Sequence, residues 1–329
     1  MFSIRLLVVS LTAATCVSQG GWAWAQVSQA YPAKPVRIIV NSTAGGAADL
    51  VARPLAAGLE KRLSQTFIVE NRPGGNGLIG LLPVAQAAPD GYTLSLSTSA
   101  WPVEEVTNKD WPLRFSRDFS PIAIFAGGGT VIIVPTSLGV RSLRELVSYA
   151  KAHPGVLNQA VVGGQNAPGD IQLLWRRLGI HDLIVSVPFK GGPDATQAVA
   201  QGAAHIWTAT IADAIASEKA GRARLLAYTE RQRHPSLPNV PTLAESDPAL
   251  ANSEYAYWFL LMGPARLPAD IAEKLSTAVR DVTLESDYRA RADNLGIRTY
   301  FEGPEQARAH VDAELKKLTE LAASGILLR

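Results

Sequence analysis

The chain alternates short runs of β-branched and apolar residues with longer segments of helical periodicity, and this alternation constrains the fold more than any other feature. The predicted strands cover residues 36–40, 66–70, 92–97, 156–162 and 183–189. The predicted helices cover residues 49–63, 142–153, 170–178, 194–201, 268–284 and 305–323. Strands and helices that alternate at this interval are typical of α/β folds with mainly parallel sheets.

Two of the helical segments carry clear local signals. Ser142 and Glu145 have the spacing of a capping box, which predicts a helix start at this point. Pro54 lies inside the segment 49–63 and predicts either a kink or a frayed first turn there, because proline cannot donate a backbone hydrogen bond.

The composition is that of a globular protein with an extensive core. Of the 329 residues, 47% are hydrophobic and 18% are charged, so the chain can bury a large apolar surface. At about 150 residues per domain, this length favours two domains. Lys and Arg number 31 against 29 Asp and Glu, giving a net charge of +2 without a basic run, and we therefore expect no nucleic-acid binding.

The first 25 residues have the pattern of a secretory signal peptide. Arg5 supplies the positive start, residues 6–14 are almost wholly apolar, and Ala23-Trp24-Ala25 supplies the small-x-small cleavage pattern. An uncleaved membrane anchor is the alternative, but the apolar run is short of the roughly 20 residues that span a bilayer. Cleavage after Ala25 removes Cys16, the only cysteine, and leaves a chain suited to an oxidising compartment.

No repeat, low-complexity tract or Pro/Gly/Ser linker divides the mature chain. If it forms two lobes, the chain passes between them more than once, and we expect these crossings near residues 125–134 and 228–255.

Three glycine-rich loops follow predicted strands, at residues 41–49, 70–77 and 163–170. In the first, Gly45 and Gly46 let the backbone turn sharply and expose N–H groups at the positive end of a helix dipole, where a carboxylate or phosphate can bind. The loop is neither a P-loop nor a dinucleotide fingerprint. A plain strand-to-helix turn stabilised by Asp49 is the alternative, but three such loops at the carboxyl ends of strands favour a ligand site.

Residues typical of catalysis are scarce. There is no Gly-x-Ser-x-Gly elbow, and the signal peptide carries the only cysteine. The five histidines have no metal-ligand spacing: His153, His181, His205, His234 and His310. We therefore expect a protein that is not an enzyme and that uses neither a cofactor nor a metal. Trp101, Trp207 and Trp258 are predicted to pack in the core or between lobes, with a place in a pocket as the alternative.

A series of motifs is more specific than any one loop. In chain order the motifs are Tyr31-Pro32-x-Lys34-Pro35-Val36-Arg37-Ile38-Ile39-Val40, Gly45-Gly46-x-x-Asp49, Ala52-Arg53-Pro54-Leu55, Val69-Glu70-Asn71-Arg72-Pro73-Gly74, Ala88-Pro89-Asp90-Gly91-Tyr92-Thr93-Leu94, Asp118-Phe119-Ser120-Pro121-Ile122, Val187-Pro188-Phe189-Lys190-Gly191-Gly192 and Leu237-Pro238-Asn239-Val240-Pro241-Thr242. In this order and spacing they closely resemble the substrate-binding proteins of tripartite tricarboxylate transporters, the Bug family, over essentially the whole mature chain.

The resemblance implies a two-lobed α/β periplasmic binding protein of type II, the Venus-flytrap kind, with a mainly parallel central sheet in each lobe. After the signal peptide at residues 1–25, lobe 1 would comprise residues 26–127 and 250–329, and lobe 2 residues 128–249. By position, the resemblance implies a ligand-binding set of Ser42, Thr43, Ala44, Gly45, Gly46, Asp49, Thr98, Ser99, Asn166, Ala167, Asp170, Ala209 and Thr210.

Several positions depart from the usual family pattern. Where the family commonly has Pro-Phe-Pro-Pro-Gly-Gly, this chain has Asn41-Ser42-Thr43-Ala44-Gly45-Gly46. Ala167 replaces a hydroxyl residue, Asp170 replaces a His, and Ala209 replaces an Asp. If Asp170 faces the ligand, its charge disfavours a second carboxylate and favours a neutral or cationic group; a helix N-cap facing away is the alternative.

The resemblance also implies the partners. The ligand would be a small organic acid held mainly by backbone N–H groups, and the loaded protein, a monomer in the periplasm, would dock on a membrane transporter with one large and one small integral subunit. Two alternatives stay open at this point: a sensor that presents its loaded form to a membrane receptor kinase, and an exported α/β enzyme.

Overall fold

The computed structural model describes residues 31–162, 169–251 and 253–323. The predicted signal peptide therefore lies outside the described residues. Within them, strands and helices alternate as the sequence predicts, and the expected α/β class is confirmed. Each of the six predicted helices is present with bounds that agree within two residues.

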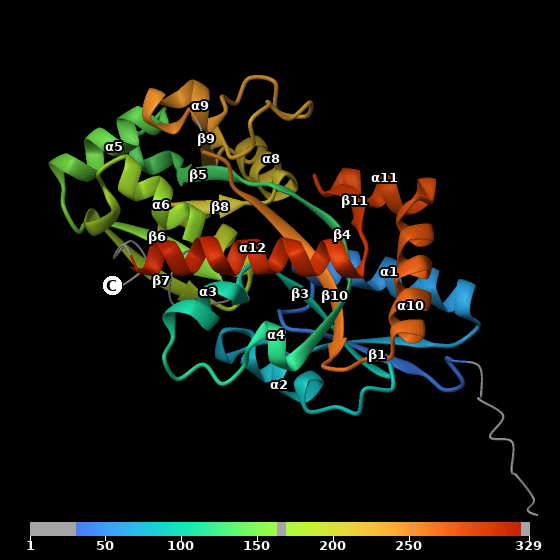
Figure 1. Cartoon of the computed structure of the whole chain (residues 1–329). Coiled ribbons are helices and arrows are strands. Elements are labelled where there is room, and N and C mark those ends of the chain that lie inside the picture. The colour runs from blue at the N-terminus through green and yellow to red at the C-terminus, as the bar shows by residue number, and fades with distance from the viewer. Residues whose placement is uncertain (1–30, 163–168, 252, 324–329) are drawn as a thin grey trace, which may run out of the picture. The chain divides into compact units, whose positions relative to one another are not determined.

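A six-stranded mixed sheet forms the larger part of the fold (Figure 1). Its strand order is β11-β4-β10-β3-β1-β2. The strands are β1 (Val36–Val40), β2 (Phe67–Asn71), β3 (Thr93–Thr98), β4 (Phe119–Gly129), β10 (Ala256–Pro264) and β11 (Arg298–Glu302). The neighbours β2, β1 and β3 are parallel, whereas β10 is antiparallel to both β3 and β4, and β11 is antiparallel to β4.

The remaining strands form two smaller sheets. The first has the order β8-β5-β9 and is antiparallel, with β5 (Val131–Pro135), β8 (Trp207–Ala209) and β9 (Ala223–Tyr228). The second is a parallel pair of β6 (Leu157–Val162) and β7 (Ile184–Phe189). A single parallel bridge from Gln159 to Ile206, next to β8, connects the two.

The prediction of mainly parallel sheets was wrong, because three of the eight strand pairings in the described residues are parallel and five are antiparallel. The apolar runs predict buried strands, but a strand buried on both faces has the same composition in either direction. The direction is set by tertiary pairing instead: β10 returns from the far end of the chain and inserts between β3 and β4.

Twelve α-helices are described. They are α1 (Ala47–Leu63), α2 (Leu78–Ala85), α3 (Trp101–Thr107), α4 (Phe115–Asp118), α5 (Leu143–Ala152), α6 (Gly169–Arg177), α7 (Gly192–Ala200), α8 (Ile211–Lys219), α9 (Leu243–Ser246), α10 (Ala269–Thr283), α11 (Ser286–Asn294) and α12 (Pro304–Ala323). Among the described residues, no helix combines the length and apolar character needed to cross a membrane.

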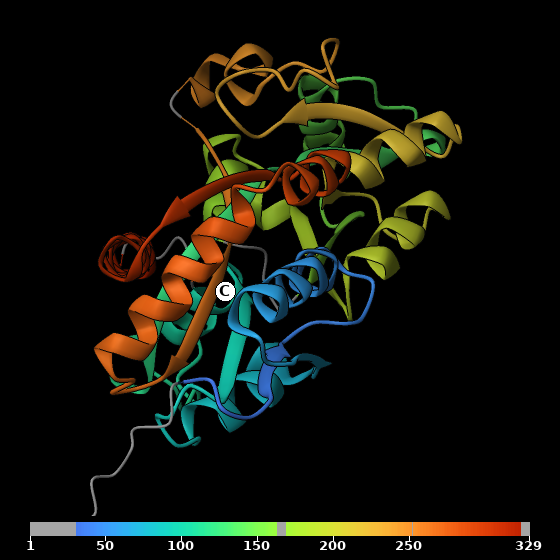
Figure 2. The ribbon, with the colours of Figure 1, turned by 90° about the vertical axis from the view of Figure 1, so that its right-hand side faces the viewer.

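Helix α1 is the element that positions the first glycine loop. Its residues Val51, Leu55 and Leu59 are buried on one face against the six-stranded sheet, and each buried side chain of this size contributes about 1.5–3 kcal/mol. The helix continues through Pro54, which is half-buried. Figure 2 shows α1 lying beside α10, where a Cβ at Gly58 would come within 2.5 Å of Val282 Cγ1.

The capping box predicted for α5 is only half formed. The Ser142 side chain accepts the Glu145 N–H at 3.1 Å, but the Glu145 carboxylate accepts the Arg141 N–H instead of that of Ser142. The complete box lies at α9, where Thr242 and Glu245 bond reciprocally. Both helices thus begin on a hydroxyl cap, as Ser and Thr favour.

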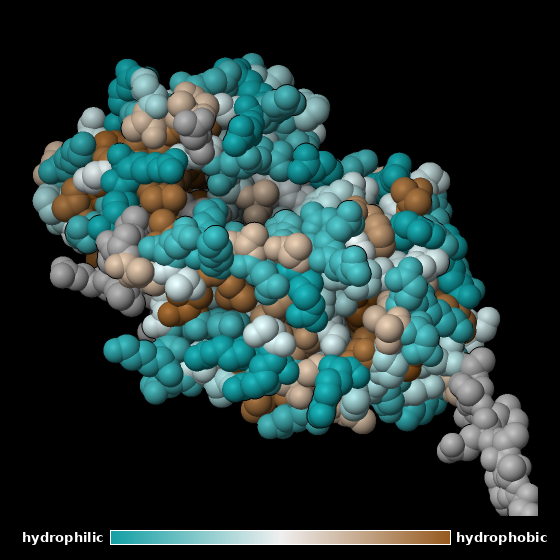
Figure 3. Space-filling view, viewed as in Figure 1, coloured by the Kyte–Doolittle hydropathy of each residue, from teal (hydrophilic) through white to brown (hydrophobic). Residues whose placement is uncertain are grey.

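The six-stranded sheet has its own apolar core, and the two smaller sheets share another. One pair of clusters packs against the two faces of the six-stranded sheet, and another pair surrounds the smaller sheets. Helix α12 runs across β4 and α3 in Figure 1, where Leu318 packs against Val103. On the face shown in Figure 3, hydrophobic residues are scattered among hydrophilic ones.

Candidate ligand-binding site

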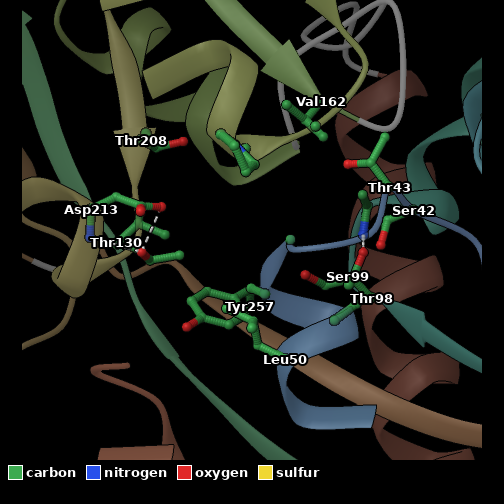
Figure 4. A pocket seen from close by; sticks show the side chains of 18 of the residues that line it. Ser42, Thr43, Leu50, Thr98, Ser99, Thr130, Val162, Thr208, Asp213 and Tyr257 are labelled. Carbon is green, nitrogen blue, oxygen red and sulfur yellow. Dashed lines mark hydrogen bonds between the residues drawn. The ribbon is translucent and has the colours of Figure 1, made fainter. Parts of the chain in front are cut away.

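A cavity of about 210 Å³ is lined by residues from two sheet systems, the six-stranded sheet with its loops and the two smaller sheets with theirs. This is smaller than the roughly 300–1,000 Å³ of pockets for drug-sized ligands, so it suits a compact molecule. The side chains labelled in Figure 4 form two groups that face each other, with Ser42, Thr43, Thr98 and Ser99 on one side and Thr130, Thr208 and Asp213 on the other.

The first glycine loop supplies one wall. Gly45 adopts a φ of +77°, which lets its N–H reach Asp49 Oδ2 at 3.0 Å, while the Gly46 N–H donates to Thr43 O at 3.3 Å. Gly46 is the N-cap of α1 and provides no side-chain cap. The amides of Ala47 and Ala48, which also line the cavity, belong to the first helical turn, where a helix offers no carbonyl partner.

Three further helices begin at this cavity. Helix α3 begins directly after Ser99 and Ala100, α7 begins directly after Gly191, and α8 begins directly after Thr210. Of these, α3 and α7 have no side-chain cap, like α1. The starts of α1, α3 and α7 place partial positive charge at the cavity, which suits an anion, although Pro102 and Pro193 each remove one N–H donor from α3 and α7. At α8, the Thr210 hydroxyl and the Asp213 carboxylate already occupy the helix start.

The side chains that line the cavity carry little positive charge. Among the lining residues in the described ranges there is no Lys or Arg, and Asp213 is the one Asp or Glu. Several rings contribute to the apolar walls, including Trp101, Trp207 and Tyr257. An anion here would therefore be bound by main-chain and hydroxyl donors and not by a salt bridge to a Lys or Arg side chain of the described residues.

Three buried polar atoms of lining residues have no hydrogen-bond partner in the protein. These atoms are Ser42 Oγ, Trp101 Nε1 and Tyr257 Oη. Burial, followed by the charges of neighbouring groups that include Asp213, raises the pKa of Tyr257, so this hydroxyl stays protonated. Buried polar groups are normally paired, and unpaired ones beside a cavity indicate that a ligand completes the bonding.

Asp49 lies behind the loop instead of facing the cavity. Its side chain is 3% exposed, and its carboxylate accepts the Gly45 N–H and pairs with Arg53 at 2.9 Å. Burial alone would raise the pKa of Asp49, but hydrogen bonds from Arg53, Gly45 and Asn71, together with the Arg53 charge, hold the pKa below its usual value. Asp49 therefore holds the turn in shape and does not itself line the cavity.

The structure brings most of the described candidate residues to one place. The predicted site residues that line the cavity are Ser42, Thr43, Gly45, Gly46, Thr98, Ser99 and Thr210. Ala44, Asp49 and Ala209 are not among the lining residues. Asn166, Ala167 and the side chain of Asp170 lie outside the described part of the chain.

Sequence reasoning missed a second group of lining residues. Asn76 and Gly77 belong to the second glycine loop, whereas Gly191 and Gly192 form a fourth loop with the same strand-glycine-helix pattern, which could have been found by the same rule. Asp213 and Tyr257 carried no local signal. Within the described ranges, no group of three or more His, Cys, Asp or Glu side chains could hold a metal ion.

Comparison with known proteins identifies the family. Residues 51–324 match the model of the tripartite tricarboxylate transporter family receptor, TctC. BugT of Bordetella pertussis is 28% identical over 292 residues, covering 87% of this chain and 88% of BugT.

Solved structures agree with this match. Rpa4515 from R. palustris, solved with adipate, has a TM-score of 0.81 at 28% identity, over 89% of this chain and 97% of that one. MatC from Rhodopseudomonas palustris, solved with bound malate, has a TM-score of 0.81 at 27% identity, over 88% and 99%. The chain therefore belongs to the tripartite tricarboxylate transporter receptor family of periplasmic binding proteins, and it is a binding protein of a transporter, not an enzyme.

Proposed function

We propose that this receptor captures a small organic acid in the cavity, holds one carboxylate at the start of α1, and delivers the acid to a tripartite membrane transporter. The observation that carries the proposal is the convergence of three helix starts without a side-chain cap on a cavity whose described lining has no Lys or Arg. The relatives solved with adipate and with malate support a carboxylate ligand.

The available donors are sufficient for useful affinity. A hydrogen bond to a charged group contributes about 1.5–3 kcal/mol net, so three such bonds supply about 4.5–9 kcal/mol. Millimolar and micromolar dissociation constants correspond to about 4.1 and 8.2 kcal/mol. Backbone amides of α1 with the Ser42 hydroxyl can therefore hold a carboxylate without an arginine.

We assign two lobes to the mature chain, with residues 26–127 and 250–329 in lobe 1 and residues 128–249 in lobe 2. The strand connections support this assignment. Only Thr130 separates β4 of the six-stranded sheet from β5 of the antiparallel sheet, and the chain returns between β9 and β10. A ligand that touches both sheet systems would draw the lobes together.

The family and the first segment support the periplasm as the place of action. Export to the periplasm, with cleavage near Ala25, agrees with a periplasmic binding protein family. There the loaded monomer would dock on the large and small integral subunits of its transporter.

Ligand identification tests the proposal directly. The purified protein is denatured, released small molecules are identified by mass spectrometry, and a panel of organic acids is then titrated by calorimetry with their methyl esters as controls. We expect a carboxylate to bind, its ester to bind at least about tenfold more weakly because the charge is lost, and the melting temperature to rise with ligand concentration. Equal affinity for acid and ester would contradict the carboxylate site.

A further inference from the structure

One carboxylate stands alone in the wall of the cavity opposite the first glycine loop. Asp213 is in the first turn of α8, and the N-cap of that helix, Thr210, accepts the Asp213 N–H at 3.2 Å and donates its hydroxyl to Asp213 Oδ2 at 2.9 Å. These two bonds fix the orientation of the side chain. A carboxylate has about four acceptor positions, so the single bond from Thr210 leaves Asp213 able to accept from a ligand.

A second polar group belongs to the same cavity lining. Tyr257 lines the cavity, is only 8% exposed, and its hydroxyl has no partner in the protein. Figure 4 shows Tyr257 below Asp213 and Thr130, between them and Leu50. Burial is the main cause of the raised pKa of Tyr257, and the Asp213 charge adds to it less than Tyr228, Tyr255 and Glu230 do.

The surroundings favour a positive group at this end. A second carboxylate would meet the Asp213 charge in a cavity without a described Lys or Arg to compensate for it. An ammonium group would instead find an anionic acceptor, the Tyr257 oxygen and the Thr208 hydroxyl. The aromatic ring of Tyr257, which also lines the cavity, can attract a cation through its π face.

We propose that Asp213, Tyr257 and Thr208 form a subsite for a positively charged nitrogen, so that the ligand of this receptor is an amino-carboxylate instead of a dicarboxylate. This inference rests on the proposed function, because the carboxylate end of the same ligand binds at the start of α1. The distance between the two ends selects among amino-carboxylates by length.

Matched ligand pairs test the proposal. Succinate, glutarate and adipate are compared by calorimetry with β-alanine, 4-aminobutyrate and 5-aminopentanoate, in which an ammonium replaces one carboxylate on the same spacer. A set of α-amino acids completes the panel. We expect the best amino-carboxylate to bind at least tenfold more tightly than the best dicarboxylate.

Variants assign the preference to the subsite. Asp213→Asn keeps an oxygen for Thr210 but removes the charge, and we expect it to weaken the best amino-carboxylate at least tenfold while leaving dicarboxylates unchanged or tighter. Asp194→Asn is the matched control, because Asp194 is in the first turn of the neighbouring helix α7, is exposed and does not line the cavity. Tyr257→Phe keeps the ring and is an independent test; we expect a several-fold loss for the amino-carboxylate alone.

The outcomes separate the two proposals. Wild-type protein that binds dicarboxylates at least as tightly as amino-carboxylates overturns the subsite and leaves the proposed function standing. Equal losses for both ligand classes in Asp213→Asn and in Tyr257→Phe also overturn the subsite, since they indicate a structural role. Failure of every acid in the panel to bind overturns the proposed function and the subsite together.

Discussion

Gly45 and Gly46 are adjacent, but they are glycines for different physical reasons. Gly45 has a φ of +77°, and a Cβ at this position would have no atom within 4 Å. Only the backbone conformation of Gly45 therefore disfavours other residues. Gly46 has an ordinary φ of −74°, and a Cβ there would lie 3.2 Å from Thr43 O. The first glycine therefore permits the turn, and the second permits its tight closure.

The strain at Gly45 leads to a prediction with a close control. Gly45→Ala forces a residue with a side chain into the left-handed region at a cost of about 1 kcal/mol. If the loop relieves this strain by moving, ligand binding must restore the turn, and affinity falls about fivefold. Gly139 has a φ of +76°, has open space around it and does not line the cavity. Urea unfolding should show that Gly139→Ala lowers the free energy of unfolding as much as Gly45→Ala does, whereas calorimetry should show unchanged ligand affinity for Gly139→Ala. An equal loss of affinity in Gly139→Ala would contradict this explanation.

Asp49 makes stability depend on pH. Because its pKa is lowered in the folded protein, the stability it contributes is present above the unfolded-state pKa of about 3.9 and is lost as pH falls through the folded pKa. Asp49→Asn should cost about 1–2 kcal/mol at pH 7, the value of the buried bond from Gly45 after the exposed Arg53 pair is discounted for solvent screening.

Urea unfolding at pH 7 and at pH 3 measures this effect. The gap between wild type and Asp49→Asn should narrow at the lower pH, whereas the exposed Asp194→Asn should leave stability nearly unchanged at both. If the difference in the free energy of unfolding is the same at both pH values, the charge of Asp49 does not contribute to stability.

At the scale of elements, the contact between α1 and α10 depends on a missing side chain. Gly58 is buried inside α1, where alanine would favour the helix by about 1 kcal/mol, but its Cβ would lie 2.5 Å from Val282 Cγ1 and 2.7 Å from Val282 Cγ2. We expect Gly58→Ala to destabilise the protein by about 1–3 kcal/mol in spite of its helix propensity, because overpacking outweighs it.

A double-mutant cycle checks the assignment to this contact. Val282→Ala removes the obstructing methyl groups, so Gly58→Ala in that background should cost at least about 1 kcal/mol less than in the wild type, as measured by urea unfolding. Additive effects would place the strain elsewhere.

Elements could be predicted from local signals, whereas their assembly could not. The helix at residues 142–153 was predicted from Ser142 and Glu145 because capping is a contact within four residues, and α5 confirms it. The antiparallel insertion of β10 between β3 and β4 joins residues 127–167 positions apart in the sequence, and no local pattern encodes it. The candidate site divides in the same way: the first glycine loop was predictable, but Asp213 and Tyr257 reach the cavity only through the pairing of distant strands.

At the scale of the whole molecule, Thr43 and Gly191 bring the six-stranded sheet and the β6–β7 pair into contact at the cavity. Thr43 follows β1 of the six-stranded sheet, and Gly191 follows β7 of the parallel pair. A Cβ at Gly191 would lie 3.4 Å from Thr43 Cβ and 2.1 Å from Thr43 Oγ1. Disulfides typically have Cβ atoms 3.5–4.5 Å apart, so cysteines at these two positions can bond with little movement.

This geometry predicts that Thr43→Cys with Gly191→Cys produces a lockable receptor. In the mature chain these would be the only cysteines, since Cys16 lies in the segment expected to be removed. Oxidation of the loaded variant should slow ligand release at least about tenfold, which corresponds to about 1.4 kcal/mol in the barrier, because release requires the two sheet systems to separate at this contact. Exchange of bound ligand against an isotope-labelled copy measures the rate, with reduction by dithiothreitol and the Thr43→Cys single variant as controls. If the oxidised and reduced forms exchange ligand equally fast, the ligand leaves by another path, and closure of the two lobes over the cavity cannot be what retains it.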